Sequence, residues 1–373
     1  MERQLSKPRP DWPARLEEHG FLFHSEGQSG TYWDESVCYR FTTAEIDCLD
    51  DATAELHALC LEAVDRIVRA GRYERFDLPP GAAGLIEHSW KARVPHLYGR
   101  MDLAYDGSGP PKLLEYNADT PTALLEAAVA QWVWLEQVHP EADQFNSIHE
   151  KLIARWRAVA GGRVHFAAVT TSLEDRSTVL YLADTASQAG IEPVEIDIAD
   201  VGWNPQRGFV DLQERPIHTA FKLYPTEWML REAFGDKLAQ ANTRWIEPPW
   251  KLLLSSKAIL PLLWEFNPGH PHLLEAHYGE PPPQGRWARK PIYSREGANV
   301  SLVDTGRTIT AAPGRYGHQP VIHQAYAPLY QRDGTHAVIG SWVIGDQSAG
   351  IGIREDASAV TMNTSHFAPH YFV

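Results

Sequence analysis

The sequence is poor in cysteine and lacks the short motifs of several common enzyme classes. Its 373 residues include three cysteines, Cys38, Cys48 and Cys60, which form no CxxC pair. An odd number of cysteines without CxxC spacing argues against a disulfide framework and against a cysteine zinc site. The sequence also contains no HExxH or GxSxG motif, no GxxxxGK[ST] phosphate loop and no dinucleotide-type GxGxxG turn. Zinc hydrolases, serine hydrolases and the two commonest nucleotide loops are therefore disfavoured.

Positive charge and long apolar runs are scarce as well. The chain has 34 Lys and Arg against 48 Asp and Glu, a formal net charge of −14. Because phosphates attract basic surfaces, we expect no nucleic-acid partner; an acidic surface suits a cationic ligand such as a polyamine, and equally an ordinary acidic enzyme. No apolar run reaches the roughly 18 residues of a membrane span, and the amino-terminal segment does not resemble a signal peptide. We therefore expect a cytoplasmic protein without a membrane partner.

The chain is longer than the roughly 250–300 residues at which one core stops growing, so one elaborated domain or several lobes are expected. Apolar spacing predicts helices, and period-two alternation or short apolar runs predict strands. An alternation of strand and helix predicts a small parallel α/β lobe, and the region after residue 289 is strand-like with many turns, which predicts an antiparallel carboxyl-terminal portion. The fold class is thus α+β or α/β. The segments used below are a helix over 43–69 capped by Thr43, strands over 97–106 and 112–117, a helix over 121–137, the α/β lobe over about 163–225, and helices over 227–241 and 250–266.

Four polar residues alternate along the two predicted strands of the first half. Arg100 and Asp102 are two apart on the first strand, and Glu115 and Asn117 are two apart on the second. Since strand residues alternate between faces, a hairpin would gather two carboxylates, an amide and a guanidinium on one face. Hard oxygen ligands of this kind bind Mg²⁺, and an arginine beside them suits a phosphoryl group in transfer. The pattern equally fits a surface hairpin with cross-strand ion pairs.

Two lysines and an arginine stand out in the second half. Lys257 lies in an apolar stretch predicted to be helical, so its ammonium needs water, a partner or a ligand. Lys290 lies on a predicted strand before a loop that contains Gly297, an arrangement that often holds ATP phosphates. Arg354 lies on a glycine-containing strand that a ligand can approach closely, and it could bind a carboxylate or phosphate with two N–H groups. Solvated lysines and a paired arginine remain the alternatives.

Long phrases in one order extend from about Trp33 to about Pro369. They are LYGRMDLAYDG, LLEYNADTPTALLEAA, QFNSIHEKLI, FKLYPTEWM, WIEPPWKLLLSSKAILPLLWE, RKPIYSREGANV, VIGSWVIGD and GIGIRED. Together they are more specific than any single motif. With these phrases, the sequence resembles the carboxyl-terminal synthetase domain of the glutathionylspermidine synthase family.

This resemblance implies an ATP-grasp-like fold for the whole of 1–373, with the lobe at about 163–225 receiving substrate and a lid lobe at about 250–330. ATP would lie between lobes, with Mg²⁺ on its phosphates. The implied reaction is that of an ATP-dependent carboxylate–amine ligase, in which ATP phosphorylates a carboxylate and an amine attacks the acyl phosphate. The implied acid is glutathione or a related peptide, and the implied amine is polyamine-like. The family also suggests a homodimer.

The resemblance also implies a role for each matched residue. Asp102, Glu115 and Asn117 resemble the Mg²⁺ ligands, and Arg100 resembles the arginine that stabilises charge developing at the phosphoryl and acyl groups. The ATP-binding residues implied by the match are Lys257 and Lys290 on the phosphates, Ser294 and Gly297 in a lid loop that ends at Asn299, and Gln324 on the adenine side.

Three further matches concern the acid substrate. Arg354 resembles a residue near the phosphate and the acid, and Thr122 and Glu174 fall where the family contacts the thiol peptide. Ala123 replaces a hydroxyl residue that the family often has. The chain is too short for the family's amidase domain, so we expect a short stand-alone member. Two alternatives stay open: the same ligase chemistry on another acid and amine, such as a peptide or cell-wall precursor, and a non-catalytic nucleotide-binding protein.

Overall fold

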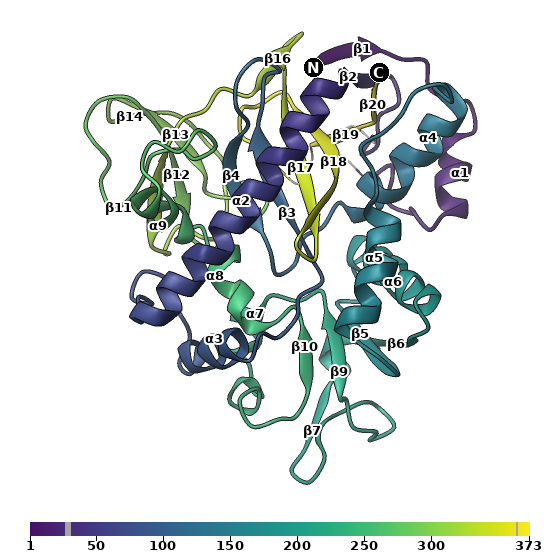
Figure 1. Ribbon diagram of the computed structural model, residues 1–373, viewed down its shortest axis with the longest axis vertical. Helices are drawn as coiled ribbons and strands as arrows, with labels where there is room; N and C mark the ends of the chain where they lie inside the picture. The colour runs from purple at the N-terminus through teal and green to yellow at the C-terminus, as the bar shows by residue number, and fades with distance from the viewer. Residues whose placement is uncertain (27–30, 363–364) are drawn as a thin grey trace.

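A six-stranded antiparallel sheet runs through the middle of the molecule and carries the predicted hairpin (Figure 1). The computed structural model describes residues 1–26, 31–362 and 365–373. Along β3, Met101 and Leu103 are fully buried while Arg100 and Asp102 alternate with them, so one face of the hairpin is apolar and the other polar. The strand order is β19 (His366–Ala368), β18 (Gln347–Asp356), β17 (Thr335–Ile344), β3 (Tyr98–Ala104) and β4 (Lys112–Asn117), with β16 (Tyr330–Arg332) beside β17.

The apolar face of this sheet is covered by the long helix α2 (Thr43–Ala70), which crosses it obliquely (Figure 1). The predicted helix is confirmed, but its cap is Thr42 and not Thr43. The Thr42 side chain accepts from the backbone N–H of Glu45, and the Glu45 carboxylate accepts from the backbone of Thr42. This reciprocal pair satisfies two N–H groups of the first turn, and Gly71 ends the helix in a left-handed conformation.

The predicted parallel lobe is present and is larger than expected. Its sheet has four parallel strands in the order β10 (Arg244–Ile246), β9 (Thr219–Lys222), β5 (Arg163–Ala168) and β6 (Glu192–Asp197). The sheet therefore extends beyond residue 225. A helix over 227–241 is wrong, because only α7 (Thr226–Met229) and the 3₁₀ turn η3 (Gly235–Lys237) form there. At Gly235 a Cβ would lie 2.5 Å from the carbonyl oxygen of Leu230, a fold-back that a regular helix does not make.

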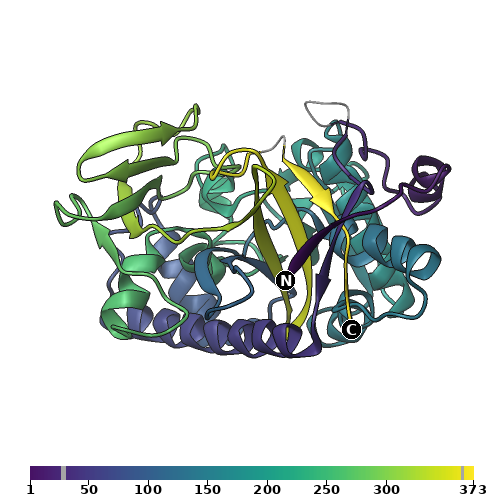
Figure 2. The same ribbon diagram turned by 90° about the horizontal axis from the view of Figure 1, so that it is seen from above.

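A second antiparallel sheet, here called the side sheet, lies beside the central one (Figure 2). The helix predicted over 250–266 is broken beneath it into three pieces, η4 (Pro249–Lys251), α8 (Leu252–Ser255) and α9 (Ile259–Phe266). The break is held open because the backbone N–H of Lys257 donates to the Ile292 carbonyl at 2.8 Å, beyond the end of β12 (Arg286–Pro291). Lys257 thus lies between helices rather than within one. The side sheet has the order β11 (Ala276–Tyr278), β15 (Val321–Ala325), β12, β13 (Ser301–Asp304) and β14 (Arg307–Ala311).

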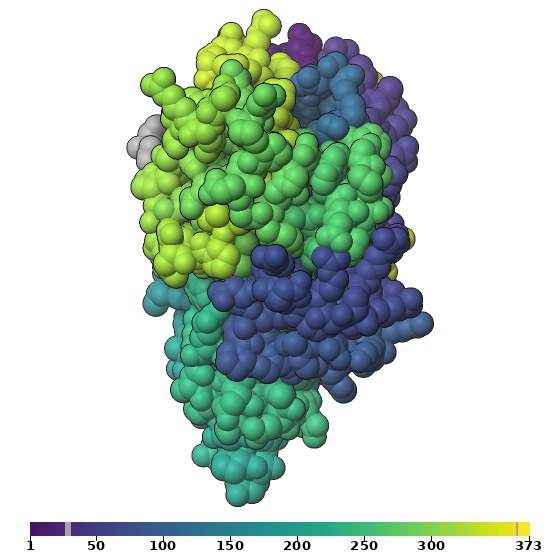
Figure 3. Space-filling model, turned by 90° about the vertical axis from the view of Figure 1, so that its left-hand side faces the viewer, coloured from purple at the N-terminus to yellow at the C-terminus, as the bar shows by residue number. Residues whose placement is uncertain are grey.

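The remaining elements close the molecule around these sheets. The helix predicted over 121–137 starts later and includes a π-helical turn, η1 (Glu126–Ala130), which packs on β18. Seen from the side, the parallel lobe tapers away below the side sheet (Figure 3). The other elements are β1 (Glu2–Leu5), β2 (Val37–Phe41) and β20 (His370–Phe372) in a three-stranded sheet, β7 (Gly202–Asn204) with β8 (Gly208–Val210), and the helices α1 (Trp12–Glu18), α3 (Ala82–Lys91), α4 (Gln131–Val138), α5 (Ile148–Val159), α6 (Leu173–Gln188) and η2 (Ile198–Asp200).

Candidate active site

A cavity of about 290 Å³ opens between the polar face of the central sheet and the side sheet. Residues of β3 and β4 form one wall, residues of β12 and β15 form another, and loops from the parallel lobe complete it. Eleven of the twelve site residues predicted from the sequence line this cavity, and Glu174 is the exception, although its neighbour Asp175 does. The eleven are Arg100, Asp102, Glu115, Asn117, Thr122, Lys257, Lys290, Ser294, Gly297, Gln324 and Arg354.

The hairpin presents its polar residues as two directly opposed pairs. Arg100 lies opposite Asn117, and Asp102 lies opposite Glu115. Tyr116, between the two β4 residues, points instead to the apolar face and packs with the core under α2. The period-two pattern of the sequence therefore produced the expected gathering of charges, because the strands pair in the register that keeps both apolar sets buried.

Arg100 is held flat against the sheet. Its guanidinium donates to both carboxylate oxygens of Asp102, at 2.7 and 3.2 Å, and to the Thr122 carbonyl at 2.6 Å. Gly340 on β17 makes this possible, because a Cβ there would lie 2.9 Å from Cδ of Arg100. Three hydrogen bonds fix the cation beside the cavity with little freedom to reorient.

The two lysines reach the cavity from different elements, Lys257 from the break between α8 and α9 and Lys290 from β12. Lys257 lies 2.8 Å from a carboxylate oxygen of Glu115 and donates to the Ser294 carbonyl at 2.6 Å. Lys290 donates to the side-chain oxygen of Gln324 at 2.7 Å and to the Leu114 carbonyl at 3.0 Å. Both ammonium groups are thus aimed at the β4 edge of the cavity, although they lie on separate elements.

These charges set the ionisation of the site. Burial by itself would raise the pKa of Glu115, but Lys257 and Lys290 outweigh it and lower that pKa well below its ordinary value. Burial lowers the pKa of Lys290 to about 8, against the opposing attraction of Glu115. At neutral pH Glu115 is therefore ionised.

The loop from Ser294 to Asn299 covers one side of the cavity and depends on a glycine. Gly297 has φ of +67°, and a Cβ on it would lie 2.2 Å from the Thr361 carbonyl oxygen. Only glycine permits both that backbone conformation and that approach. The close approach at Gly297 holds this loop against the segment that follows β18, and β18 itself carries Arg354.

Three acidic residues lie near Arg354, and of these three Asp175 lines the cavity. Burial raises the pKa of Glu174, and burial together with Glu174 raises the pKa of Asp175 to about 6. Burial also raises the pKa of Glu126 to about 7; one of its oxygens accepts from the Tyr32 hydroxyl at 2.7 Å. Glu126 is buried and the other two carboxyl residues are half-buried. The three outnumber the two arginines that act on Glu174, Arg354 and Arg100, so this region favours a bound cation.

Sequence reasoning missed Arg295 and Asp175. Arg295 lines the cavity from the loop after β12, donates to Glu227 at 2.5 Å and stacks 5.2 Å from the ring centre of Trp228. Its signal was present, because it is the one cation inside the predicted lid loop. Asp175 gave no separate signal, since adjacent helical residues usually point in different directions.

The residues of the hairpin fit a magnesium ion. Two carboxylates and an amide oxygen, from Asp102, Glu115 and Asn117, share one face, and few hard oxygen ligands with room for phosphate oxygens are what Mg²⁺ prefers. The lysines and Arg100 around them suit a polyphosphate.

Among the described residues, the helices include none that is both long and apolar enough to cross a membrane.

Comparisons with known proteins find relatives along nearly the whole chain. The model of the family described as glutathionylspermidine synthase preATP-grasp matches residues 3–373. A Haemophilus influenzae protein provisionally named an acid–amine ligase is 43% identical, with all of both chains covered. Crithidia fasciculata trypanothione synthetase is 31% identical over 84% of this chain and 53% of its own. The Escherichia coli bifunctional glutathionylspermidine synthetase/amidase is 26% identical over 89% of this chain and 58% of its own, so the chain spans little more than half of these two relatives.

Proposed function

The chain belongs to the glutathionylspermidine synthase family, and we propose that it is an ATP-dependent ligase that joins a carboxylate to an amine through an acyl phosphate. The observation that carries this proposal is the meeting of Lys257, Lys290 and Arg100 with Asp102 and Glu115 in one cavity between two antiparallel sheets. Relatives named as ligases support the reaction class. Phosphoryl transfer needs positioning and charge neutralisation more than a covalent nucleophile, and these residues supply both.

In this proposal the nucleotide end of the cavity is formed by both sheets. Asp102, Glu115 and Asn117 would hold Mg²⁺, which when bound neutralises charge on the phosphates. Lys257 and Lys290 bind the phosphate oxygens. Gln324 accepts from Lys290 at 2.7 Å and donates to the Leu113 carbonyl at 2.9 Å, so it orients that lysine from the adenine side.

The acid substrate would lie between Arg100 and Arg354. Arg100 stabilises the negative charge that develops when the carboxylate takes the phosphoryl group, since its guanidinium is already fixed by Asp102 and the Thr122 carbonyl. Arg354 lies over the ring of Phe367 at 4.9 Å and supplies a second cation for the acid. The loop containing Ser294 and Gly297 excludes water, which would otherwise hydrolyse the acyl phosphate.

For the substrates themselves we propose a glutathione-like peptide and a polyamine-like amine. Thr122 and Glu174 contact the peptide, and the excess of carboxyl groups near Asp175 suits the ammonium groups of the amine. The printed names of the Crithidia and Escherichia relatives support this substrate class. The substrate lobe at about 163–225, the lid lobe at about 250–330 and a homodimer belong to the same proposal.

The test is ADP release by the purified protein with Mg-ATP, with glutathione and spermidine added singly and together. Release that needs both, with an amide product seen by mass spectrometry, supports the full proposal. If ADP release instead requires a different acid–amine pair from a substrate panel, the ligase reaction is supported and the proposed substrates are wrong. ATP binding without turnover on any pair contradicts the ligase and favours a nucleotide-binding protein. The variant Lys257→Met controls for contaminating ATPases.

A further inference from the structure

Two histidines and an aspartate meet on the side of the hairpin that faces α2. His57 comes from α2, His96 precedes β3, and Asp346 lies in the turn between β17 and β18. We propose that these three side chains, the His–His–Asp cluster, bind a divalent transition-metal ion such as Zn²⁺. The proposal is independent of the ligase reaction, because none of the three lines the cavity of the candidate active site.

The spacing of the donor atoms is that of a metal site. Nε2 of His57 and Nε2 of His96 lie 3.3 and 3.0 Å from the same oxygen of Asp346, and one donor atom from each of the three lies within 4.8 Å of the others. In a tetrahedral zinc site with bonds of about 2.0–2.1 Å, ligand atoms are about 3.3 Å apart. One ion can therefore contact all three donors after only small shifts of the side chains.

Both rings can offer a lone pair. Both rings are buried. The Tyr116 hydroxyl lies 3.0 Å from Nδ1 of His57 and can accept a hydrogen bond from Nδ1–H, in the tautomer that leaves Nε2 free for a metal. In the metal-free protein the Asp346 carboxylate accepts from Nε2–H of both rings, and an ion that binds there takes the place of those protons. Within the described part of the chain Nδ1 of His96 has no partner.

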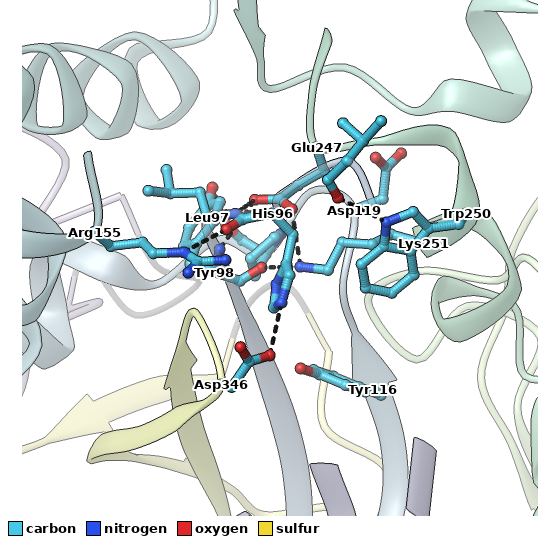
Figure 4. Close-up of polar contacts among 12 residues, drawn as sticks. His96, Leu97, Tyr98, Tyr116, Asp119, Arg155, Glu247, Trp250, Lys251 and Asp346 are labelled. Carbon is cyan, nitrogen blue, oxygen red and sulfur yellow. Dashed lines mark hydrogen bonds and ion pairs between the residues drawn. The ribbon is translucent and has the colours of Figure 1, made fainter. Parts of the chain in front are cut away.

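The surroundings of the His–His–Asp cluster allow an ion to enter and limit its repulsion by nearby cations. The Asp346 side chain is 62% exposed, so an ion can enter from solvent and keep a water as its fourth ligand. Two cations lie near the histidines, but each has a partner (Figure 4). Lys251 is 2.9 Å from Glu247 and also donates to the Tyr98 carbonyl, and Arg155 donates to the His96 carbonyl at 2.7 Å. The charge of Lys251 is thereby balanced within the protein.

The donor set also selects the class of ion. Two imidazoles with one carboxylate favour Zn²⁺ and its first-row neighbours over Mg²⁺, which prefers oxygen ligands. Tyr116 lies between Glu115 and Asn117 on β4, so this ion would lie on the opposite face of the strand from the proposed magnesium ligands. Bound there, it would tie α2 to the start of β3 and to the β17–β18 turn.

The test uses the full chain stripped with a chelator and titrated with Zn²⁺ by calorimetry in excess Mg²⁺, with Co²⁺ visible absorption as a second readout. We expect one ion per chain and a higher Tm. Because loss of even an indirect metal partner costs about 10–100-fold, Asp346→Asn is expected to weaken binding about 100-fold or more. Asp346 is exposed, so this variant should fold, and circular dichroism checks that it does. His96→Gln should show the same loss.

The matched control is His270→Asn. His270 and His272 also face one carboxylate, but they contact different oxygens of Glu55, at 3.0 and 3.5 Å. This variant should bind Zn²⁺ as the parent does. The proposal is overturned if the parent binds no ion at one-to-one stoichiometry, if Asp346→Asn binds as tightly as the parent, or if His270→Asn removes the site. The cluster would then be a hydrogen-bonded triad.

Discussion

The carboxylate of Glu115 and the ammonium of Lys257 form an ion pair of 2.8 Å across the cavity, from β4 to the break between α8 and α9. In the proposed reaction each group binds another partner: the carboxylate binds Mg²⁺, and the ammonium binds a phosphate. The ion pair holds both charges in place until Mg-ATP binds. In the proposed complex Mg²⁺ would then neutralise Glu115, and a phosphate would neutralise Lys257. Binding of metal and nucleotide should therefore be mutually dependent.

Glu115→Gln tests the metal side of this pair. The substitution keeps the size of the side chain and removes its charge, so Lys257 loses its partner and the hairpin loses a proposed ligand. With saturating substrates, ADP release should fall by about 10²-fold or more. Glu62→Gln, at an exposed α2 position paired with Arg66, should release ADP at the parental rate. Unchanged turnover in Glu115→Gln would rule out its role as a ligand.

Lys290 should make ATP binding sensitive to alkaline pH. Its pKa is lowered by burial to about 8, so the ammonium loses its proton as the pH rises through that value. The dissociation constant for Mg-ATP, measured by calorimetry, should then increase by up to about tenfold per pH unit above pH 8. Lys290→Arg keeps its charge and should flatten the profile. An equally steep rise in that variant would assign the dependence to another group.

The same shift has a consequence for stability. Because the folded-state pKa of Lys290 lies below the ordinary lysine value of 10.5, the unfolded chain binds more protons between the two values. The contribution of this residue to the free energy of unfolding therefore increases as the pH rises from about 8. Urea unfolding of the parent and of Lys290→Met at several pH values measures it, and identical pH slopes would contradict it.

Gly297→Ala should disable the loop without unfolding the protein. The new Cβ would meet the Thr361 carbonyl, so the loop must move away from the cavity. Since a misplacement of 1 Å can cost about 10²-fold in rate, we expect a loss of this order with little change in Tm. Gly306→Ala is the matched control, because Gly306 has a similar φ of +79° and no atom within 4 Å of its Cβ position. Equal effects of the two substitutions would point to backbone strain alone.

Glu174→Gln should separate the acid substrate from the nucleotide. Loss of a charged hydrogen-bonding partner is expected to raise KM for the acid by about tenfold or more, with KM for ATP unchanged. Asp184→Asn, an exposed position on the same helix α6, should change neither constant. A rise in KM for ATP, or in KM for the amine alone, would contradict the peptide contact proposed for Glu174.

Asp119→Ala should be strongly destabilising. Asp119 is buried and accepts from Lys222 at 2.7 Å and from the backbone N–H of Thr226 at 2.8 Å, which joins the end of the hairpin to the parallel lobe. Removing one partner of a buried ion pair costs about 3–5 kcal/mol in the free energy of unfolding, because the other charge stays buried. The exposed pair of Arg163 and Glu192 gives the control Glu192→Ala, whose urea midpoint should match that of the parent.

Part of the fold could be predicted because its signals are local. The alternation of Met101 and Leu103 with Arg100 and Asp102 fixed both the strand and the face on which its charges lie. The helix predictions failed where distant backbone intervened. The segment around Lys257 has the apolar composition of a helix, but the backbone N–H of Lys257 donates to the Ile292 carbonyl, 35 residues away, and no local pattern contains that contact.

Local pattern is enough to show which side chains of each strand share a face, since side-chain direction alternates with every residue along a strand. Which of those groups meet depends on the packing of elements that are distant in the chain. The pairing of Glu115 with Lys257, the placing of Arg295 and Asp175 beside them, and the convergence of His57, His96 and Asp346 all join residues far apart in the chain. Such contacts depend on how helices and sheets pack around a common core, and that packing is a property of the whole chain.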